Sequence, residues 1–233
     1  MPLELDSRVC GPIHVVSAKG LLVAGPECGQ LEAILNLDSR RHLKQVVLEV
    51  SGLDRLDSLG LGLIVRTAAS LRRRNGDLRL ANPTPVITQL LELTRVASIL
   101  NAYPTDEAAI LSFLENEPAP AASNCTGCCI MIVDRSPDFV AFVATLLAQH
   151  NCDVKLAGLL SDAKILLRFQ PVDTILIGSG PMPAANMALT LQTVAPKAKI
   201  LTLDPTLHTR EAHEAAEEIL QMLQSHGILP AQA

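Results

Sequence analysis

The sequence predicts an α/β protein of two domains, each with a β-sheet covered by helices. Short apolar runs typical of buried strands alternate with stretches of helical periodicity along the whole chain. Residues 115–124 interrupt this alternation, because they contain two prolines, small residues and no apolar period to bury. The length of 233 residues suits two domains of ordinary size. We therefore expect a first domain at 1–114, a linker at 115–124 and a second domain at 125–233.

In the first half, brief apolar runs closed by turn residues predict the strands. These strands are expected around Ile13 and Val15, then at Leu21–Ala24, Val46–Val50, Leu78–Ala81 and, at an edge, Ile99–Leu100. Apolar residues at helical spacing predict helices at Leu31–His42, from Gly60 to Arg74, at Val86–Leu93 and at Asp106–Leu114. This order indicates a small mixed sheet with helices.

The second half begins the alternation again. Strands are expected at Cys129–Val133, Val154–Ala157, Asp173–Ile177 and Lys199–Leu203. Helices are expected after Asp138, from Ser161 (as the cap) to Leu167, at Asn186–Val194, and in one long stretch from Pro205 to His226. Strands that alternate with helices at this spacing indicate a doubly wound parallel sheet.

The most informative stretch is Asp57-Ser58-Leu59-Gly60, between the strand Val46–Val50 and the helix that follows. Ser58 falls where an N-cap is expected, so its hydroxyl would lie among the free N–H groups of the first turn. A phosphate placed there would be held by the same N–H groups. From the residues alone, the simplest interpretation of Ser58 is a helix cap and nothing more.

The chain from about Ile13 to Leu114 resembles the STAS family, the anti-sigma factor antagonist domain. Several of its elements match in order: the strand Val46–Leu53, the D-S-x-G turn Asp57–Gly60, then Asn75–Ala81, Pro85–Thr94 and Asp106–Ala109. Glu49 departs from the family, because many relatives have aspartate there. The resemblance implies a STAS-type mixed sheet in the first domain.

The resemblance also implies a function. It makes Ser58 the phosphorylation target and places Asp57, Ser58, Leu59 and Gly60 in the turn that binds the partner. The implied partner is an anti-sigma factor or serine kinase of the histidine-kinase-like ATPase family, and a phosphatase would reset the switch. Asp57 either orients the hydroxyl or is a first-turn acid favoured by the helix dipole. Gly60 and Gly62 either admit a partner's backbone or relieve crowding.

The second half looks like a response-regulator receiver domain that has lost its chemistry. Asp134 follows the first strand as in that family, but Arg135 replaces its acidic neighbour and Gly178 stands at the phosphoacceptor position. No lysine occurs after Lys199, and the last strand–helix unit is missing. Acyl-phosphate chemistry needs clustered carboxylates. We therefore expect a degenerate receiver-like domain in which Asp134 is a cap or turn acid, and whose low charge suggests dimerisation or partner docking.

Composition excludes several classes of function. The net charge of -5 and the lack of a basic stripe beyond Arg72–Arg74 argue against direct nucleic-acid binding. No apolar segment is long enough to span a bilayer and no leader pattern opens the chain, so we expect a soluble cytoplasmic protein without membrane insertion. No nucleotide, dinucleotide or hydrolase motif occurs. We expect no enzyme activity, no cofactor and no metal.

Three of the six cysteines cluster at Cys125, Cys128 and Cys129. A C-x-x-C pair can be half of a zinc site or a redox dithiol, but a second ligand pair is missing and the pair leads into a strand rather than a helix. We expect reduced thiols, with Cys129 a small core residue. A dithiol enzyme using Cys125 and Cys128 is the weaker alternative.

The sequence thus leaves two main hypotheses. In the first, the protein is an anti-sigma factor antagonist that phosphorylation of Ser58 releases from its partner. In the second, it is a STAS scaffold subunit of a larger assembly, stressosome-like or lipid-transporting, that works without phosphorylation. The phosphorylation state of Ser58 discriminates between them.

Overall fold

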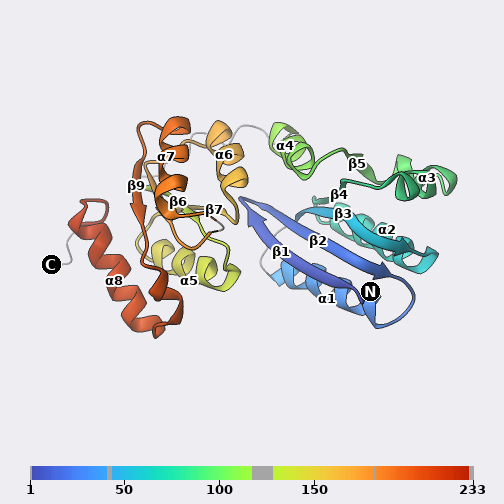
Figure 1. Cartoon of the computed structure of the whole chain (residues 1–233), viewed down its shortest axis with the longest axis horizontal. Helices are drawn as coiled ribbons and strands as arrows, with labels where there is room; N and C mark the ends of the chain where they lie inside the picture. The colour runs from blue at the N-terminus through green and yellow to red at the C-terminus, as the bar shows by residue number, and fades with distance from the viewer. Residues whose placement is uncertain (1, 41–43, 117–127, 181, 231–233) are drawn as a thin grey trace. The chain divides into compact units, whose positions relative to one another are not determined.

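The chain forms two compact units, and each is a β-sheet with helices on its faces (Figure 1). The computed structural model describes residues 2–40, 44–116, 128–180 and 182–230. Unit 1 is Met1–Glu117 and unit 2 is Pro118–Ala233. The predicted α/β class is confirmed. Glu115 and Asn116, expected in the linker, instead belong to the last helix of unit 1, and residues 117–124 lie outside the described residues.

Unit 1 contains a five-stranded mixed sheet in the order β5-β4-β3-β2-β1. Its strands are β1 (Glu4–Cys10), β2 (Ile13–Leu22), β3 (Gln45–Leu56), β4 (Asp77–Ala81) and β5 (Asn101–Tyr103). β1 and β2 form an antiparallel hairpin, whereas β2, β3, β4 and β5 run parallel. Gly11 turns the hairpin with φ of 56°, a left-handed conformation that glycine adopts without strain.

The helices of unit 1 cover both faces of this sheet. They are α1 (Pro26–Arg40), α2 (Ser58–Arg72), α3 (Pro85–Leu93) and α4 (Asp106–Asn116), with a 3-10 turn η1 (Val96–Ser98). Alternate strand residues such as Val46 and Leu48 pack on α1 and α2 in one core, while α4 covers the opposite face (Figure 1). The predicted edge strand at Ile99–Leu100 is wrong by two residues, because η1 occupies the chain just before it.

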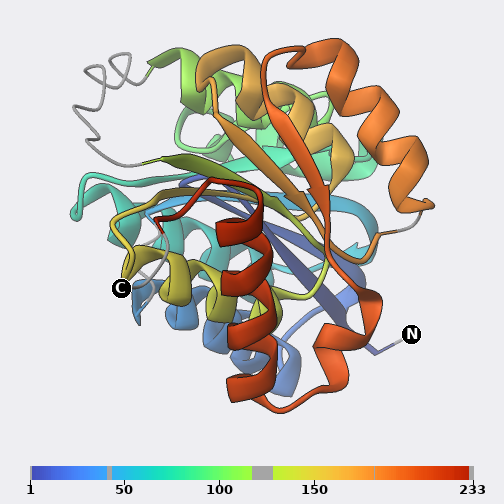
Figure 2. The ribbon, with the colours of Figure 1, turned by 90° about the vertical axis from the view of Figure 1, so that its left-hand side faces the viewer.

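Unit 2 contains a parallel four-stranded sheet in the order β7-β6-β8-β9. Its elements are β6 (Cys129–Val133), α5 (Pro137–Ala148), β7 (Asp153–Ala157), α6 (Leu160–Phe169), β8 (Thr174–Ile177), α7 (Ala184–Val194), β9 (Lys199–Thr202), the 3-10 turn η2 (Pro205–Thr209) and α8 (Ala212–Ser225). Helices α5 and α8 lie on one face and α6 and α7 on the other (Figure 2). This is the expected doubly wound arrangement.

Two local predictions for unit 2 are wrong. Ser161 does not cap α6, since Leu159 holds the N-cap position and makes no side-chain bond there. The long helix expected from Pro205 to His226 is divided into η2 and α8. The division matters, because η2 carries His208 back to the end of the sheet.

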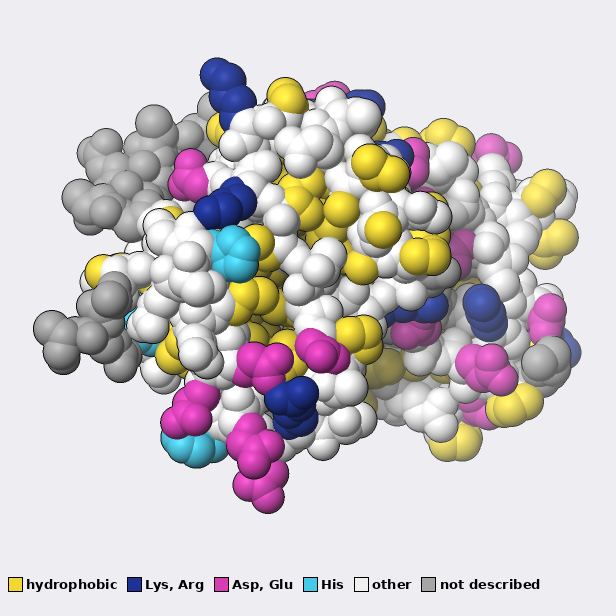
Figure 3. All heavy atoms as spheres, turned by 60° about the vertical axis from the view of Figure 1, so that its left-hand side comes forward, with side chains coloured by type: hydrophobic (Ala, Val, Ile, Leu, Met, Phe, Trp, Pro, Cys, Tyr) yellow, Lys and Arg dark blue, Asp and Glu magenta, His cyan; other side chains and the backbone are white. Residues whose placement is uncertain are grey.

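The outer edge of β9 opens into an apolar groove between α7 and α8 (Figure 3). Its lining includes Leu189 of α7, Ile200 and Thr202 of β9, and Met222 of α8. The side chain of Leu189 is 70% exposed, which is unusual for a leucine on a helix that also faces a core. Within the described ranges, the helices are too short or too polar for any of them to cross a membrane.

Candidate functional site

The Asp57–Gly60 turn lies where the parallel strands β2 and β3 end side by side. The backbone N–H of Asp57 donates to Leu22 O, the last residue of β2, at 3.3 Å. The segment that leaves β2 toward α1 therefore runs beside the start of α2. Both segments are at the carboxyl edge of the sheet, where parallel α/β proteins usually place their sites.

Asp57, not Ser58, is the N-cap of α2, which corrects the sequence-based prediction. Its carboxylate Oδ1 accepts from the N–H of Leu59 at 3.0 Å and of Gly60 at 2.8 Å. Its other oxygen accepts from the N–H of Ala24 at 2.8 Å. Asp57 is the cap itself rather than a first-turn acid, and its carboxylate joins the β2–α1 segment to the beginning of α2.

These backbone bonds keep Asp57 negatively charged. The N–H of Gly60, followed by that of Ala24, lowers the pKa of Asp57 below its ordinary value of 3.8. The same carboxylate contributes, after burial, to raising the pKa of the Cys28 thiol. The turn thus carries a fixed negative charge at neutral pH.

Ser58 and Leu59 are the exposed residues of the turn. Ser58 is the first residue of α2, and its hydroxyl has no hydrogen-bond partner among the residues that the structure describes. The side chain of Leu59 is 56% exposed beside it. A free hydroxyl and a large exposed apolar side chain therefore lie next to each other at the tip of the turn.

The two glycines of the turn have different surroundings. A Cβ on Gly60 would lie 2.5 Å from Leu22 O, so only glycine lets α2 start this close to β2. A Cβ on Gly62 would meet nothing within 4 Å. Gly60 therefore relieves crowding inside the fold, whereas the open space at Gly62 gives it no such role.

The N–H groups at the start of α2 are already hydrogen-bonded, which limits how a phosphate on Ser58 could be held. The N–H groups of Leu59 and Gly60, which the sequence suggested as phosphate ligands, already donate to Asp57. A phosphate on Ser58 would have to compete with a carboxylate for them and would lie beside its charge. The turn is thus suited to display a phosphate on the surface rather than to enclose it.

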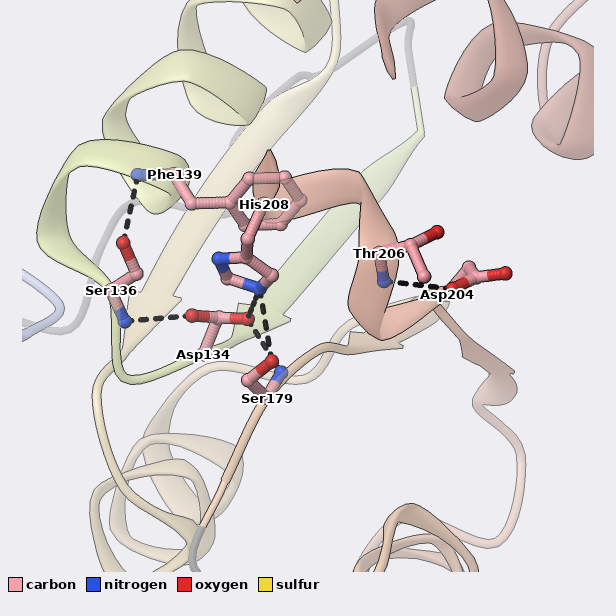
Figure 4. Close-up of polar contacts among 7 residues, drawn as sticks. All are labelled: Asp134, Ser136, Phe139, Ser179, Asp204, Thr206 and His208. Carbon is pink, nitrogen blue, oxygen red and sulfur yellow. Dashed lines mark hydrogen bonds and ion pairs between the residues drawn. The ribbon is translucent and has the colours of Figure 1, made fainter. Parts of the chain in front are cut away.

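Unit 2 has a second aspartate turn at the end of β6, and here the carboxylate is enclosed (Figure 4). Asp134 is 2% exposed and accepts from the N–H of Ser136 at 2.7 Å and of Ser179 at 2.6 Å. His208 Nε2 lies 3.0 Å from its Oδ2 and 3.1 Å from Ser179 Oγ. The His208 ring stacks on Phe139, with centroids 4.1 Å apart.

This arrangement fills the end of the sheet in unit 2. Any side chain at position 178 would overlap Asp134 Oδ2. Ser179 and Asp134 both approach the same nitrogen of His208, so the three do not form the relay of a hydrolase triad, in which serine and aspartate bond opposite ring nitrogens. The α5 cap is Ser136, and Asp134 is a buried turn acid. Sequence inspection missed His208, for which the only signal is the cap Asp204-Pro205 that starts η2.

The cysteine cluster is only partly described. Cys125 lies outside the described residues. Cys129 is half-buried at the start of β6, and the thiols of Cys152 and Cys128 pack against the core between the sheet and helices α5 and α8. Within the described ranges, no three His, Cys, Asp or Glu side chains are grouped to hold a metal ion.

Comparison with known proteins identifies the family of unit 1. Residues 8–109 match the STAS domain family. The chain is 32% identical over 84 residues to the "putative anti-sigma factor antagonist BtrV" of Bordetella bronchiseptica, covering 36% of this chain and 72% of that protein.

Several solved structures also match, with lower identity. A "putative anti-sigma factor antagonist" from Thermotoga maritima is 18% identical with a TM-score of 0.44, covering 46% of this chain and 92% of that one. An anti-sigma factor antagonist from Mycobacterium paratuberculosis is 20% identical with a TM-score of 0.43, covering 47% and 92%. With the turn and sheet described above, the family match and the Bordetella relative show that the chain belongs to the STAS-domain family of anti-sigma factor antagonists.

Proposed function

We propose that this protein is a regulatory binding protein without enzyme activity, which docks an anti-sigma factor or serine kinase through the Asp57–Gly60 turn and is released by phosphorylation of Ser58. The observation that carries the proposal is the exposed hydroxyl of Ser58, which has no hydrogen-bond partner in the described part of the chain and lies beside the exposed Leu59. A kinase can reach such a hydroxyl without unfolding α2. Leu59 supplies apolar area for a partner.

The switch would work through charge. Unmodified, Ser58 and Leu59 form a small tip that a partner can cover. A phosphate adds about 1.5 to 2 negative charges at pH 7. Because Asp57 is already ionised and occupies the nearest N–H groups, the added charge is not neutralised within the turn. Covering it would cost both repulsion and desolvation, so affinity falls. A phosphatase would restore binding.

The test combines phosphosite mapping with partner capture in the protein's own host. Intact mass and peptide mapping should find phosphate on Ser58. Pull-down should recover an ATPase-type partner with wild type and Ser58→Ala, and lose it with Ser58→Asp. Leu59→Lys should also weaken capture, because it removes the apolar contact.

Ser70→Asp is the matched control, since Ser70 is exposed on the same helix but at its other end. It adds the same charge to α2 and should leave capture unchanged. If Ser58 carries no phosphate and all variants recover the same partners, the scaffold hypothesis replaces the switch. That result would assign the chain to a constitutive assembly such as a stressosome-like or lipid-transport complex.

We further propose that unit 2 is a receiver-like domain without phosphoryl chemistry. The parallel order β7-β6-β8-β9 supports this, since it has the 2-1-3-4 pattern of the first four strands of a flavodoxin-like sheet. The enclosed Asp134 and the crowded position of Gly178 leave no room for a phosphoacceptor. Incubation with acetyl phosphate and Mg²⁺ should leave the mass of the Ser58→Ala protein unchanged; a stable phosphoryl adduct in unit 2 would contradict this.

The groove at β9 supports self-association as the role of unit 2. The N–H groups of Lys199 and Leu203 point toward β8 and donate to Asp173 O and Ile177 O. By alternation, the N–H groups of Ile200 and Thr202 point to the open edge. Two copies pairing antiparallel with Ile200 of one opposite Thr202 of the other would place Lys199 opposite Leu203 and bring no like charges together. Sedimentation should show a dimer that Leu189→Lys dissociates and Leu93→Lys, a matched exposed leucine of unit 1, does not. A wild-type monomer at all concentrations would exclude this role.

A further inference from the structure

Two cysteines of unit 2 lie side by side at the start of neighbouring strands. Cys128 directly precedes β6 and Cys152 directly precedes β7. The first pair of the ladder is Cys129 with Asp153, and the N–H of Asp153 donates to Cys128 O at 3.0 Å. Cys128 and Cys152 therefore sit opposite each other one step before the ladder, with their side chains on the same face.

Their sulfur atoms are 2.9 Å apart, and both thiols are free in this structure. A disulfide has an S–S distance of about 2.05 Å, so a small rotation of the two side chains would bring the atoms to bonding distance. Neighbouring strands are about 4.8 Å apart, which falls inside the Cα separation of roughly 4.4–6.8 Å that disulfides span. Neither strand has to move.

Cys129, the residue next to Cys128, is not placed to form a disulfide with Cys152. The side chain of Cys129 points to the other face, where its Sγ lies 3.8 Å from Asp153 Oδ2. Burial and then Asp153 raise the pKa of the Cys129 thiol to about 11. The arrangement thus selects one pair, Cys128 with Cys152.

The two thiols of the pair differ in accessibility. Cys152 is 8% exposed, and burial, followed by Cys128, raises the pKa of its thiol to about 12. Cys128 is half-buried and is the thiol that a reagent in solution reaches first. This order favours attack by Cys128 followed by closure with Cys152.

We propose that Cys128 and Cys152 form a reversible disulfide that locks the first two strands of unit 2, a modification site independent of the Ser58 switch. A small-molecule disulfide such as oxidised glutathione is the oxidant. The Cys128 thiolate attacks one of its sulfurs, forms a mixed disulfide and releases one glutathione thiolate. Cys152 then loses its proton and attacks Cys128 Sγ, which forms the internal disulfide and releases the second glutathione thiolate. Two protein thiols are oxidised and one disulfide is reduced to two thiols.

The disulfide would close a loop that contains α5 and would restrict the unfolded chain. Such a cross-link stabilises the domain that contains it. For a domain of this size we expect the thermal midpoint of unit 2 to rise by about 10 °C on oxidation. The midpoint of unit 1 should not change.

The full-length protein allows a direct test. Trypsin is expected to give one peptide of residues 96–135, with Cys125, Cys128 and Cys129, and another of residues 136–155, with Cys152 as its single cysteine. After treatment with oxidised glutathione and alkylation of free thiols, the two peptides should be joined in the non-reduced digest. Dithiothreitol should separate them.

Variants assign the bond. Cys128→Ser and Cys152→Ser should each abolish the linked pair, while Cys129→Ser should keep it. Circular dichroism should confirm that all three variants fold. The proposal is overturned if the link survives in Cys128→Ser, if the 96–135 peptide closes on itself instead, or if residues 136–155 remain alkylated across the whole oxidant series. It is also overturned if the linked protein melts at the same temperature as the reduced one.

Discussion

The two aspartate turns of this molecule follow the same local plan but differ in what surrounds them. In each unit an aspartate directly follows a strand at the carboxyl edge of the sheet and accepts backbone N–H groups, and a serine follows within two residues. In unit 1 the serine is exposed, and none of the described residues forms a hydrogen bond with its hydroxyl. In unit 2 a histidine from η2 and the segment after β8 cover the aspartate.

The difference teaches that a strand–Asp–Ser–helix segment does not by itself make a site. Asp57 is satisfied by backbone groups of its own turn and one neighbouring loop, which leaves Ser58 free to meet another molecule. Asp134 binds groups from three separate segments, so its carboxylate holds these segments of unit 2 together. The turn of unit 1 exposes its serine hydroxyl to solvent, whereas the turn of unit 2 covers its carboxylate.

Gly178→Asp should have the largest effect on the difference between the two turns, because it changes the stability of unit 2 alone. It would place a second carboxylate against the buried Asp134, so we expect unit 2 to lose about 3 kcal/mol of stability or to remain unfolded. Hydrogen exchange measured separately over the two units should show the loss in unit 2 alone. A stable Gly178→Asp protein that accepts a phosphoryl group from acetyl phosphate would show that the site is open after all.

Asp134→Ala should destabilise its unit more than Asp57→Ala does. Removing the buried Asp134 leaves the part-buried N–H groups of Ser136 and Ser179 without their acceptor, at a cost of about 2–3 kcal/mol. Asp57 is at the surface, where water can replace it, so Asp57→Ala should weaken partner capture with a smaller loss of stability. Urea unfolding followed by circular dichroism measures both. Equal losses of stability in Asp134→Ala and Asp57→Ala would show that the two carboxylates contribute equally to the fold, which contradicts the proposed difference between the turns.

The glycine pair of the exposed turn gives an intermediate effect. Gly60→Ala should cost about 2 kcal/mol, because its Cβ would press on Leu22 O, a backbone atom that cannot easily move. Gly62→Ala should instead stabilise α2 by up to about 1 kcal/mol, since it gains helix propensity in open space. Thermal unfolding of the two single variants should shift in opposite directions. Shifts of the same sign would show that the start of α2 is not held against β2 as described.

The smallest expected effect is in the dependence of stability on pH, where the units should differ in sign. The pKa of Asp57 is lowered in the folded state, so unit 1 should lose stability as pH falls below about 3.8. The pKa of Cys152 is raised from 9.0 to about 12, so above pH 9 the unfolded chain releases a proton that the folded one keeps. Unit 2 of the reduced protein should therefore weaken between pH 9 and 12, by up to about 1.4 kcal/mol at pH 10.

Matched variants separate these contributions from other titrations. Cys152→Ser should flatten the alkaline part of the unit 2 curve, and Asp57→Asn should flatten the acid part of the unit 1 curve. Hydrogen exchange in each unit at several pH values provides the measurement. An alkaline loss that is the same in Cys152→Ser as in wild type would assign it to other groups.

The sequence by itself determined the class of the fold and most of its elements. Apolar runs bounded by turn residues placed β6 at Cys129–Val133 to the residue, and helical spacing located α2 and α7 to within two residues at most boundaries. These patterns are local, because side-chain alternation and helix periodicity depend on which face of one element is buried. The D-S-L-G turn was found in the same way, from neighbouring residues.

The tertiary structure alone decided how the polar groups are shared. Whether Asp57 or Ser58 caps α2 depends on Ala24, which lies 33 residues away and supplies a third N–H to the carboxylate. Whether Asp134 is open depends on His208, 74 residues along the chain. The 2.9 Å approach of Cys128 to Cys152 follows from the register of β6 with β7. Hydrogen bonds and sulfur contacts join atoms that are close in space, and a linear sequence does not specify those distances.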